Sequence, residues 1–179
     1  MCSHSLTALG LPGYDAHPPD SAKGFADILK REGWSTMFLG KWDHTPQWES
    51  TFAGPFDRWP SGDGWEHFYG FMSGDMNNFN PIMWMDHTPV QPNYDLPGYH
   101  VTEDMSDTAI RWISMLRASA HDKPFAMFWA TGAVHAPHQA PREWRERFKG
   151  QFDMGYDAAR DMILERQIEM GIVPEGTRL

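Results

Sequence analysis

The sequence of 179 residues is long enough for one ordinary domain, and its 41% of hydrophobic residues argues against intrinsic disorder. Its 24 acidic and 15 basic side chains give a formal charge of −9, which excludes nucleic acid and anionic membranes as favoured partners. A single cysteine, Cys2, excludes an internal disulfide framework, and the lack of a long apolar run or a signal-peptide pattern predicts a soluble protein.

The first predicted elements form half of an α/β unit. Residues 1–20 are rich in proline, glycine and histidine and show no hydrophobic period, so we expect an extended lead-in segment. A short helix is predicted over 21–32, with Ser21 as its N-cap and Gly33 as its left-handed stop. The compact apolar run at 35–39 then predicts a buried strand.

Residues 41–100 are predicted to form a long irregular segment, because proline, glycine, aspartate and asparagine recur throughout. The segment is also rich in tryptophan and phenylalanine, so we expect it to pack against the core. The tetrapeptide Asp-His-Thr-Pro occurs at 43–46 and again at 86–89. The sequences around the two copies do not match, so we do not infer an internal repeat.

Regular structure is predicted again in the second half of the chain. Thr102 is expected to cap an amphipathic helix over 103–118, in which apolar residues recur at helical spacing. Residues 124–130 predict a second buried strand, and 142–149 and 157–170 predict two further helices. Together these elements predict an α/β fold.

Two short polar runs follow the carboxyl ends of the predicted strands, where α/β proteins usually keep their active sites. Lys41, Asp43 and His44 follow the first strand, and His135 and His138 follow the second. A lysine at such a place can bind an anionic oxygen, and a histidine can donate a proton to a leaving group. Taken one at a time, such residues are more often a solvated lysine and loop histidines with structural roles.

Three longer runs resemble the arylsulfatase family of the alkaline-phosphatase superfamily. They are Gly54-Pro-Phe-Asp-Arg-Trp-Pro60, Gly64-Trp-Glu-His-Phe-Tyr-Gly-Phe71 and Gly132-Ala-Val-His-Ala-Pro-His-Gln-Ala-Pro141. The resemblance extends from about residue 10 onward and covers an internal portion of the sulfatase catalytic domain. It implies a partial sulfatase-like sheet-and-helix unit, expected as a single truncated domain over 1–179.

The resemblance also implies roles for single residues. Lys41 matches the family lysine that binds the sulfate oxygens, and His135 matches the histidine that contacts the sulfate or protonates the leaving group. A second family histidine normally stands two residues after the lysine, where it hydrogen-bonds the hydrated formylglycine nucleophile. Asp43 occupies that position here, so either His44 takes over the role through a loop shift or the role is lost.

The family's nucleophile motif, Cys or Ser followed by x-Pro-x-Arg, is missing, because Cys2 is followed by Ser-His-Ser-Leu. The acidic residues that bind calcium in the family also have no counterpart in this sequence. We therefore expect no formylglycine, and water would attack the ester, which usually requires a Lewis acid. The candidate metal ligands suit Zn²⁺ or Mn²⁺ and are Asp43, His44, His135 and His138, with Asp86 and His87 as further possibilities.

Three functions remain open on this evidence. The first is a hydrolase that uses Lys41 and His135 on small anionic sulfate or phosphate esters. The second is a metal-dependent hydrolase built from the histidines, and the third is a non-catalytic folded remnant in which His87 and His138 are ordinary loop histidines. In each case a parallel sheet without its neighbouring strands leaves apolar edges uncovered, so we expect a homodimer or a higher oligomer.

Overall fold

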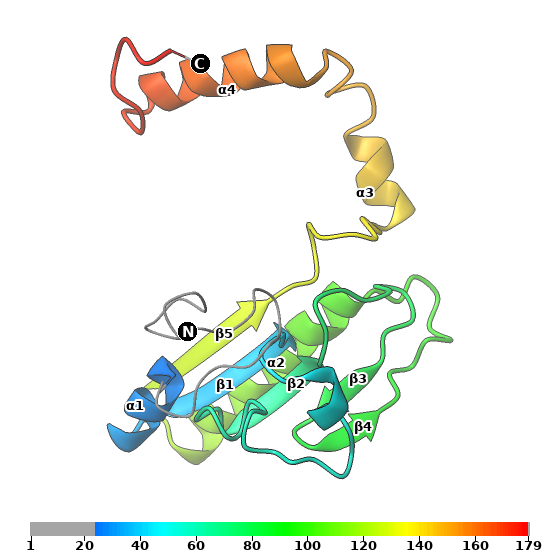
Figure 1. Cartoon of the computed structure of the whole chain (residues 1–179), viewed down its shortest axis with the longest axis vertical. Helices are drawn as coiled ribbons and strands as arrows, with labels where there is room; N and C mark the ends of the chain where they lie inside the picture. The colour runs from blue at the N-terminus through cyan, green and yellow to red at the C-terminus, as the bar shows by residue number, and fades with distance from the viewer. Residues whose placement is uncertain (1–23, 179) are drawn as a thin grey trace. The chain divides into compact units, whose positions relative to one another are not determined.

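The computed structural model describes residues 24–178, which fall into two compact units that meet between Gln139 and Ala140. The first unit holds the whole β-sheet and all the candidate site residues, and the second holds two helices (Figure 1). The single domain expected over 1–179 stays a prediction. The predicted lead-in segment, Ser21 and Cys2 lie outside the described residues.

The sheet of the first unit has five strands in the order β4-β3-β2-β1-β5. Strand β1 (Ser35–Lys41) lies between β2 (His67–Phe71) and β5 (Phe125–Ala130) and is parallel to both. Strands β3 (Met83–Met85) and β4 (Thr88–Val90) continue the sheet in antiparallel pairing. Both strands form where they are predicted, and β1 continues two residues beyond its predicted end. The expected burial of the second strand is wrong, because β5 lies at the edge of the sheet and none of its residues is buried.

The prediction that residues 41–100 are irregular throughout is wrong, because this segment contributes β2, β3, β4 and a 3₁₀ helix, η2 (Gln47–Glu49). Four consecutive residues of β2 are buried, so this strand lacks the polar–apolar alternation that reveals a half-exposed strand. Strands β3 and β4 have three residues each, too few to show any period. The aromatic side chains of the segment do pack into the core, as predicted.

The helices lie close to their predicted positions, although the first begins at Phe25 with Gly24 as its N-cap, so its predicted start with Ser21 as the cap is wrong. In the first unit these are α1 (Phe25–Arg31) and α2 (Val101–Ser119), and Gly33 follows α1 with φ = +84°, as expected for a left-handed stop. The predicted N-cap of α2 is wrong. His100 is the N-cap and its Nδ1 accepts a hydrogen bond from the Thr102 N–H at 3.3 Å, because the helix begins earlier, at the fully buried Val101.

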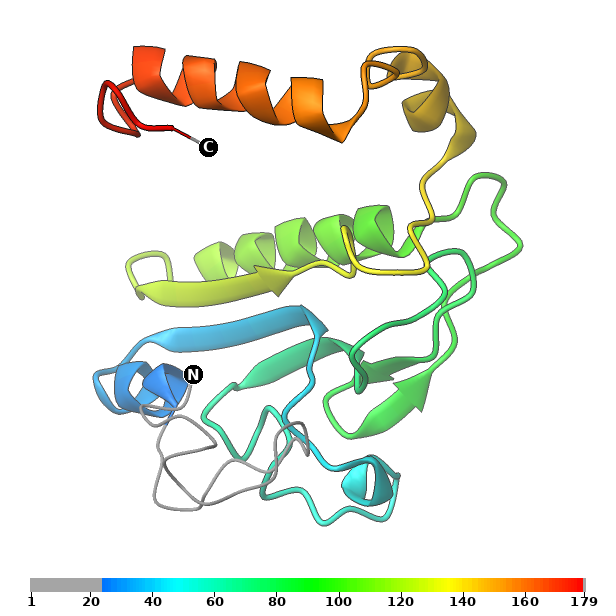
Figure 2. The ribbon, with the colours of Figure 1, turned by 45° about the horizontal axis from the view of Figure 1, so that its top comes forward.

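The core consists of two clusters that correspond to the two faces of the sheet. Phe38 and Leu39 are neighbours on β1 and point to opposite faces, as side chains on a strand must. The cluster around Leu39 includes Val101 and Met105 of α2, which lies along one face of the sheet (Figures 1 and 2). The other cluster is mainly aromatic and contains Ala26, Phe38, Trp42, Trp59, Trp65, Phe68 and Trp84.

The second unit consists of α3 (Arg142–Arg147) and α4 (Tyr156–Glu169), which confirms both helices predicted there. Neither helix has a buried residue. Among residues 24–178, no helix is both long enough and apolar enough to span a bilayer.

Candidate active site at the carboxyl ends of β1 and β5

The candidate site begins where β1 and β5 end beside one another. Gly40 of β1 is in register with Ala130 of β5, and Gly40 has φ = +108°. A Cβ atom on Gly40 would lie only 1.7 Å from the carbonyl oxygen of Ala130, so only glycine allows the two strands to approach this closely. Because the strands are parallel, the residues that follow both of them emerge at the same edge of the sheet.

Lys41 is the last residue of β1 and is half-buried. Its backbone is fixed on the other side by β2, since Lys41 is in register with Phe71 and the Trp42 N–H donates to the Phe71 oxygen at 2.9 Å. None of the ion pairs among residues 24–178 involves the Lys41 ammonium, so within the described chain it has no carboxylate partner. A half-buried cation of this kind is suited to binding an anionic group.

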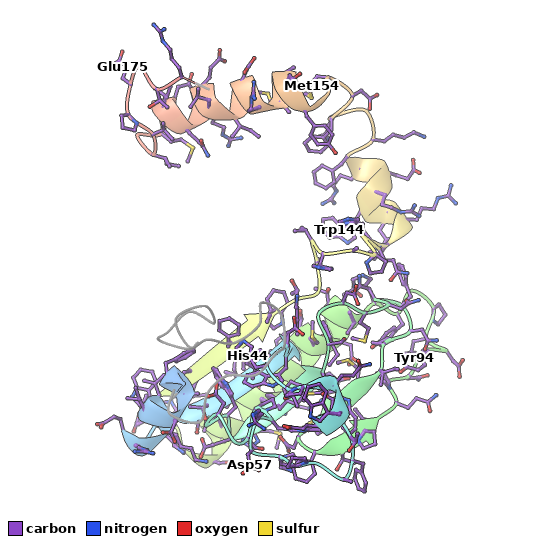
Figure 3. The ribbon with its side chains drawn as sticks, in the orientation of Figure 1. His44, Asp57, Tyr94, Trp144, Met154 and Glu175 are labelled. Carbon is purple, nitrogen blue, oxygen red and sulfur yellow. The ribbon has the colours of Figure 1, made fainter. Side chains whose placement is uncertain are left out.

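His44 lies in the loop after β1 and is labelled in Figure 3. Its ring packs on the indole of Trp42, with 4.9 Å between the ring centroids. Trp42 is held in turn by hydrogen bonds from its Nε1 to Thr45 Oγ1 at 2.9 Å and to the carbonyl oxygen of Arg58 at 3.2 Å.

The same packing affects the ionisation of His44. Although the residue keeps an exposed edge, partial burial lowers the pKa of its imidazole, and the charge of the Asp63 carboxylate opposes this shift. His44 is therefore mainly neutral at pH 7 and can accept a hydrogen bond. Sequence reasoning did not predict this effect of Asp63 on the pKa of His44, because Asp63 lies on a separate loop that precedes β2.

His135 and His138 are both exposed and lie on the loop after β5. The His135 N–H donates to the Gly132 oxygen at 3.0 Å, and the His138 N–H donates to the His135 oxygen at 3.2 Å, so the loop folds into consecutive turns. The Nδ1 atom of His135 lies 3.0 Å from the carbonyl oxygen of Ala136. Because a carbonyl oxygen only accepts, Nδ1 carries the hydrogen of this bond. Nε2 is then the ring nitrogen that can exchange a proton with a ligand.

The end of this loop is tied to the start of α2 by residues that sequence reasoning missed. The Asn78 N–H donates to Gln139 Oε1 at 2.7 Å, and Asn78 Nδ2 donates to the Gln139 carbonyl oxygen at 3.4 Å. His100 Nε2 lies 3.3 Å from the same carbonyl oxygen. Gln139 belongs to the run that carries the family resemblance, but its partner Asn78 is 61 residues away and gives no local signal.

The proposed metal ligands are not assembled within the described part of the chain. Asp43 and His44 lie on one loop, His135 and His138 lie on another, and residues 24–178 contain no group of three His, Cys, Asp or Glu side chains arranged to hold a metal ion. The described residues therefore do not by themselves fit a bound metal.

Comparison with known proteins shows the family and the fold of the chain. The family model named Sulfatase matches residues 2–170. The arylsulfatase of Klebsiella aerogenes is 28% identical over 184 residues, which cover 97% of this chain and 37% of the arylsulfatase, so the chain spans well under half of that relative.

Solved structures share the fold. Ps i-CgsB in complex with k-i-k-neocarrahexaose superposes with a TM-score of 0.61 at 22% identity, over 76% of this chain and 32% of that one. A second protein, in complex with its substrate D-glucosamine-2-N,6-O-disulfate, gives a TM-score of 0.56 at 18% identity, over 80% of this chain and 25% of that one. Lys41 and His135 thus follow the strands of a sulfatase-like α/β sheet, and the chain belongs to the sulfatase family.

Proposed function

We propose that this chain carries the ester-binding part of a sulfate-ester hydrolase, with Lys41 as the anion-binding cation and His135 as the proton donor. The observation that supports the proposal is that both residues follow the carboxyl ends of adjacent parallel strands. These two strands, β1 and β5, are in close contact at Gly40 and Ala130. Membership of the sulfatase family supports a sulfate ester as the substrate. Aryl phosphate esters present a similar tetrahedral anion and are the second substrate class.

The proposed chemistry divides between the two side chains. The Lys41 ammonium stabilises the negative charge on the non-bridging oxygens of the ester. Water attacks the sulfur atom and releases a proton to bulk solvent, the bond from sulfur to the bridging oxygen breaks, and the leaving oxygen takes a proton from His135. That proton comes from Nε2, because Nδ1 holds the carbonyl oxygen of Ala136, so the active form of His135 is the imidazolium.

The experiment measures hydrolysis of 4-nitrophenyl sulfate and 4-nitrophenyl phosphate by the purified chain. Lys41→Ala and His135→Ala should each lower the rate by about 10²-fold, the usual effect of losing a positioned charge or acid. Lys30→Ala and His121→Ala are matched controls, because both side chains are exposed and precede β1 and β5, away from the carboxyl ends that carry the site, and both should keep the wild-type rate. Wild-type rates in both site variants would refute the assignment.

Dependence on a divalent metal is part of the same proposal, because the sequence contains no nucleophile motif of the family type. Ligands beyond the described residues of one copy would be needed, and a second copy of the chain could supply further histidines. Exhaustive chelation should abolish hydrolysis, and Zn²⁺ or Mn²⁺ should restore it. Full activity in protein that elemental analysis finds metal-free would refute the metal requirement and leave the roles of Lys41 and His135 standing.

The alternative is a non-catalytic member of the family that self-associates. The observation that favours it is the position of β5 at the edge of the sheet with Phe128 and Trp129 exposed. Absence of hydrolysis with either substrate, in a protein that is folded and oligomeric, would decide for this alternative.

A further inference from the structure

The structure also brings together two reactive side chains other than Lys41 and His135. Ser61 and His87 are 26 residues apart in the sequence and meet on the surface, where Ser61 Oγ lies 2.6 Å from His87 Nε2. A serine hydroxyl bound to an imidazole nitrogen is the pair that general-base catalysis uses to activate an oxygen nucleophile. The proposed sulfatase chemistry does not use either residue.

The imidazole of His87 is held in place by aromatic side chains. The ring of Phe56 lies nearly parallel to it, with 4.2 Å between the centroids and 30° between the planes. Trp59 packs edge-on against it at 5.7 Å, and Trp59 is itself fully buried, with its Nε1 donating to the Glu49 oxygen at 2.9 Å. The ring is thus oriented by the core and not by solvent, as a positioned general base requires.

Both residues also sit on rigid turns. Ser61 lies in a compact turn in which the Gly62 N–H donates to the Trp59 oxygen at 2.9 Å. His87 lies in the two-residue turn between β3 and β4, next to Asp86. Asp86 is fixed to β2 twice, since its N–H donates to the Phe68 oxygen at 2.9 Å and its Oδ1 accepts from the Phe68 N–H at 2.9 Å.

We propose that Ser61 is a nucleophile activated by His87 and that this pair reacts with neutral, activated carboxylic esters. Ser61 Oγ forms a bond to the ester carbonyl carbon while His87 Nε2 takes the hydroxyl proton. The carbon–oxygen bond to the leaving alcohol then breaks, and His87 returns the proton to that oxygen. Water then attacks the acyl carbon while His87 takes one of its protons. The bond from that carbon to Ser61 Oγ breaks, and His87 returns the proton to Oγ.

The charge around the pair favours a neutral substrate over an anionic one. Asp86 directly precedes His87 and is exposed. Asp57, labelled in Figure 3, is exposed on the same loop as Ser61. These carboxylates repel sulfate and phosphate esters, so the substrate class of this pair differs from that proposed for Lys41 and His135.

The test uses an alkyl fluorophosphonate, a neutral reagent that gives a stable adduct when serine oxygen displaces fluoride. The full chain is incubated with the reagent, and tandem mass spectrometry locates the adduct. Label is expected on Ser61 and should disappear in Ser61→Ala, which removes only an exposed hydroxyl. Labelling should be slower by about 10²-fold in His87→Gln, which cannot act as the base.

Two controls separate activation from general reactivity and from the sulfatase proposal. Ser114→Ala should label as the wild type does, because Ser114 is an exposed serine whose hydroxyl donates to the Ile110 oxygen and has no imidazole partner. Lys41→Ala should also label normally. Far-UV circular dichroism and thermal unfolding of each variant establish that it is folded. No adduct on Ser61, or equal labelling of wild type and a folded His87→Gln, would overturn the proposal.

Discussion

Gly40 is the residue that fixes the geometry of the candidate active site. At its φ of +108°, a Cβ atom would point toward the neighbouring strand, where the carbonyl oxygen of Ala130 already occupies that position. Gly40 is also followed directly by Lys41, so the close approach and the anion-binding cation lie one residue apart. The chemistry of Lys41 therefore depends on a neighbour that has no side chain.

Gly40→Ala should destabilise the protein by about 3 kcal/mol or more, because backbone atoms of β5 would have to move and the residue would be strained at φ = +108°. Gly33→Ala is the matched control. Gly33 also has a positive φ, but nothing lies within 4 Å of its would-be Cβ, so only the backbone term of about 1–2 kcal/mol applies. Urea denaturation of both variants measures the difference, and equal losses would contradict the close-packing argument.

At the scale of elements, the sequence predicts the helices and strands whose own residues carry a recognisable hydrophobic pattern. Strand β5 is an unbroken apolar run, β1 has an apolar centre, and α2 shows a helical hydrophobic period, so all three could be predicted. The positions of Lys41 and His135 after two strands follow from them, and the roles of the two residues stay a prediction. Strands β3 and β4 depend on pairing with distant residues and have no local signature. The contact between Gln139 and Asn78 could not be predicted for the same reason, since only the folded chain brings the two residues together.

Helix α2 is joined to the sheet by a partly buried polar contact as well as by apolar packing. Asp104 Oδ2 accepts hydrogen bonds from the hydroxyl of Tyr69 on β2 at 2.5 Å and from the hydroxyl of Tyr99 at 2.9 Å. Burial and the neighbouring carboxylate raise the pKa of both tyrosines above their ordinary value. The contact therefore links α2, β2 and the loop that precedes the helix.

Asp104→Ala should lower the free energy of unfolding by about 2 kcal/mol, because two partly buried hydroxyls lose their acceptor. Asp107→Ala is the control, since Asp107 is exposed on the same helix and should have little effect. The raised tyrosine pKa values contribute stability that is fully present below pH 10, the ordinary pKa of tyrosine, and is lost as the pH rises through the folded-state values. Denaturation at pH 7 and at alkaline pH measures both effects, and an unchanged midpoint in Asp104→Ala would show that the contact adds nothing.

At the scale of the whole molecule, the two edges of the sheet differ in how they are protected. Strand β4 is short and contains Pro89, which cannot donate a ladder hydrogen bond. Strand β5 has six residues, Phe-Ala-Met-Phe-Trp-Ala, with no charge and no proline. Phe128 and Trp129 are 38% and 46% exposed on this edge strand. Strand β5 is therefore an unprotected apolar edge with which a strand of a second chain can pair.

We therefore expect the chain to form a homodimer through β5, despite the repulsion between two copies that each carry a charge of −9. Trp129→Lys should shift the protein to monomer, because it places a charge on the strand that must be buried. Trp48→Lys is the matched control: Trp48 is even more exposed, at 69%, but lies in η2 and not on a strand edge, so the variant should remain dimeric. Size-exclusion chromatography with light scattering measures the mass of each. A monomeric wild type would refute self-association, whereas a dimer that survives Trp129→Lys would place the interface on another surface.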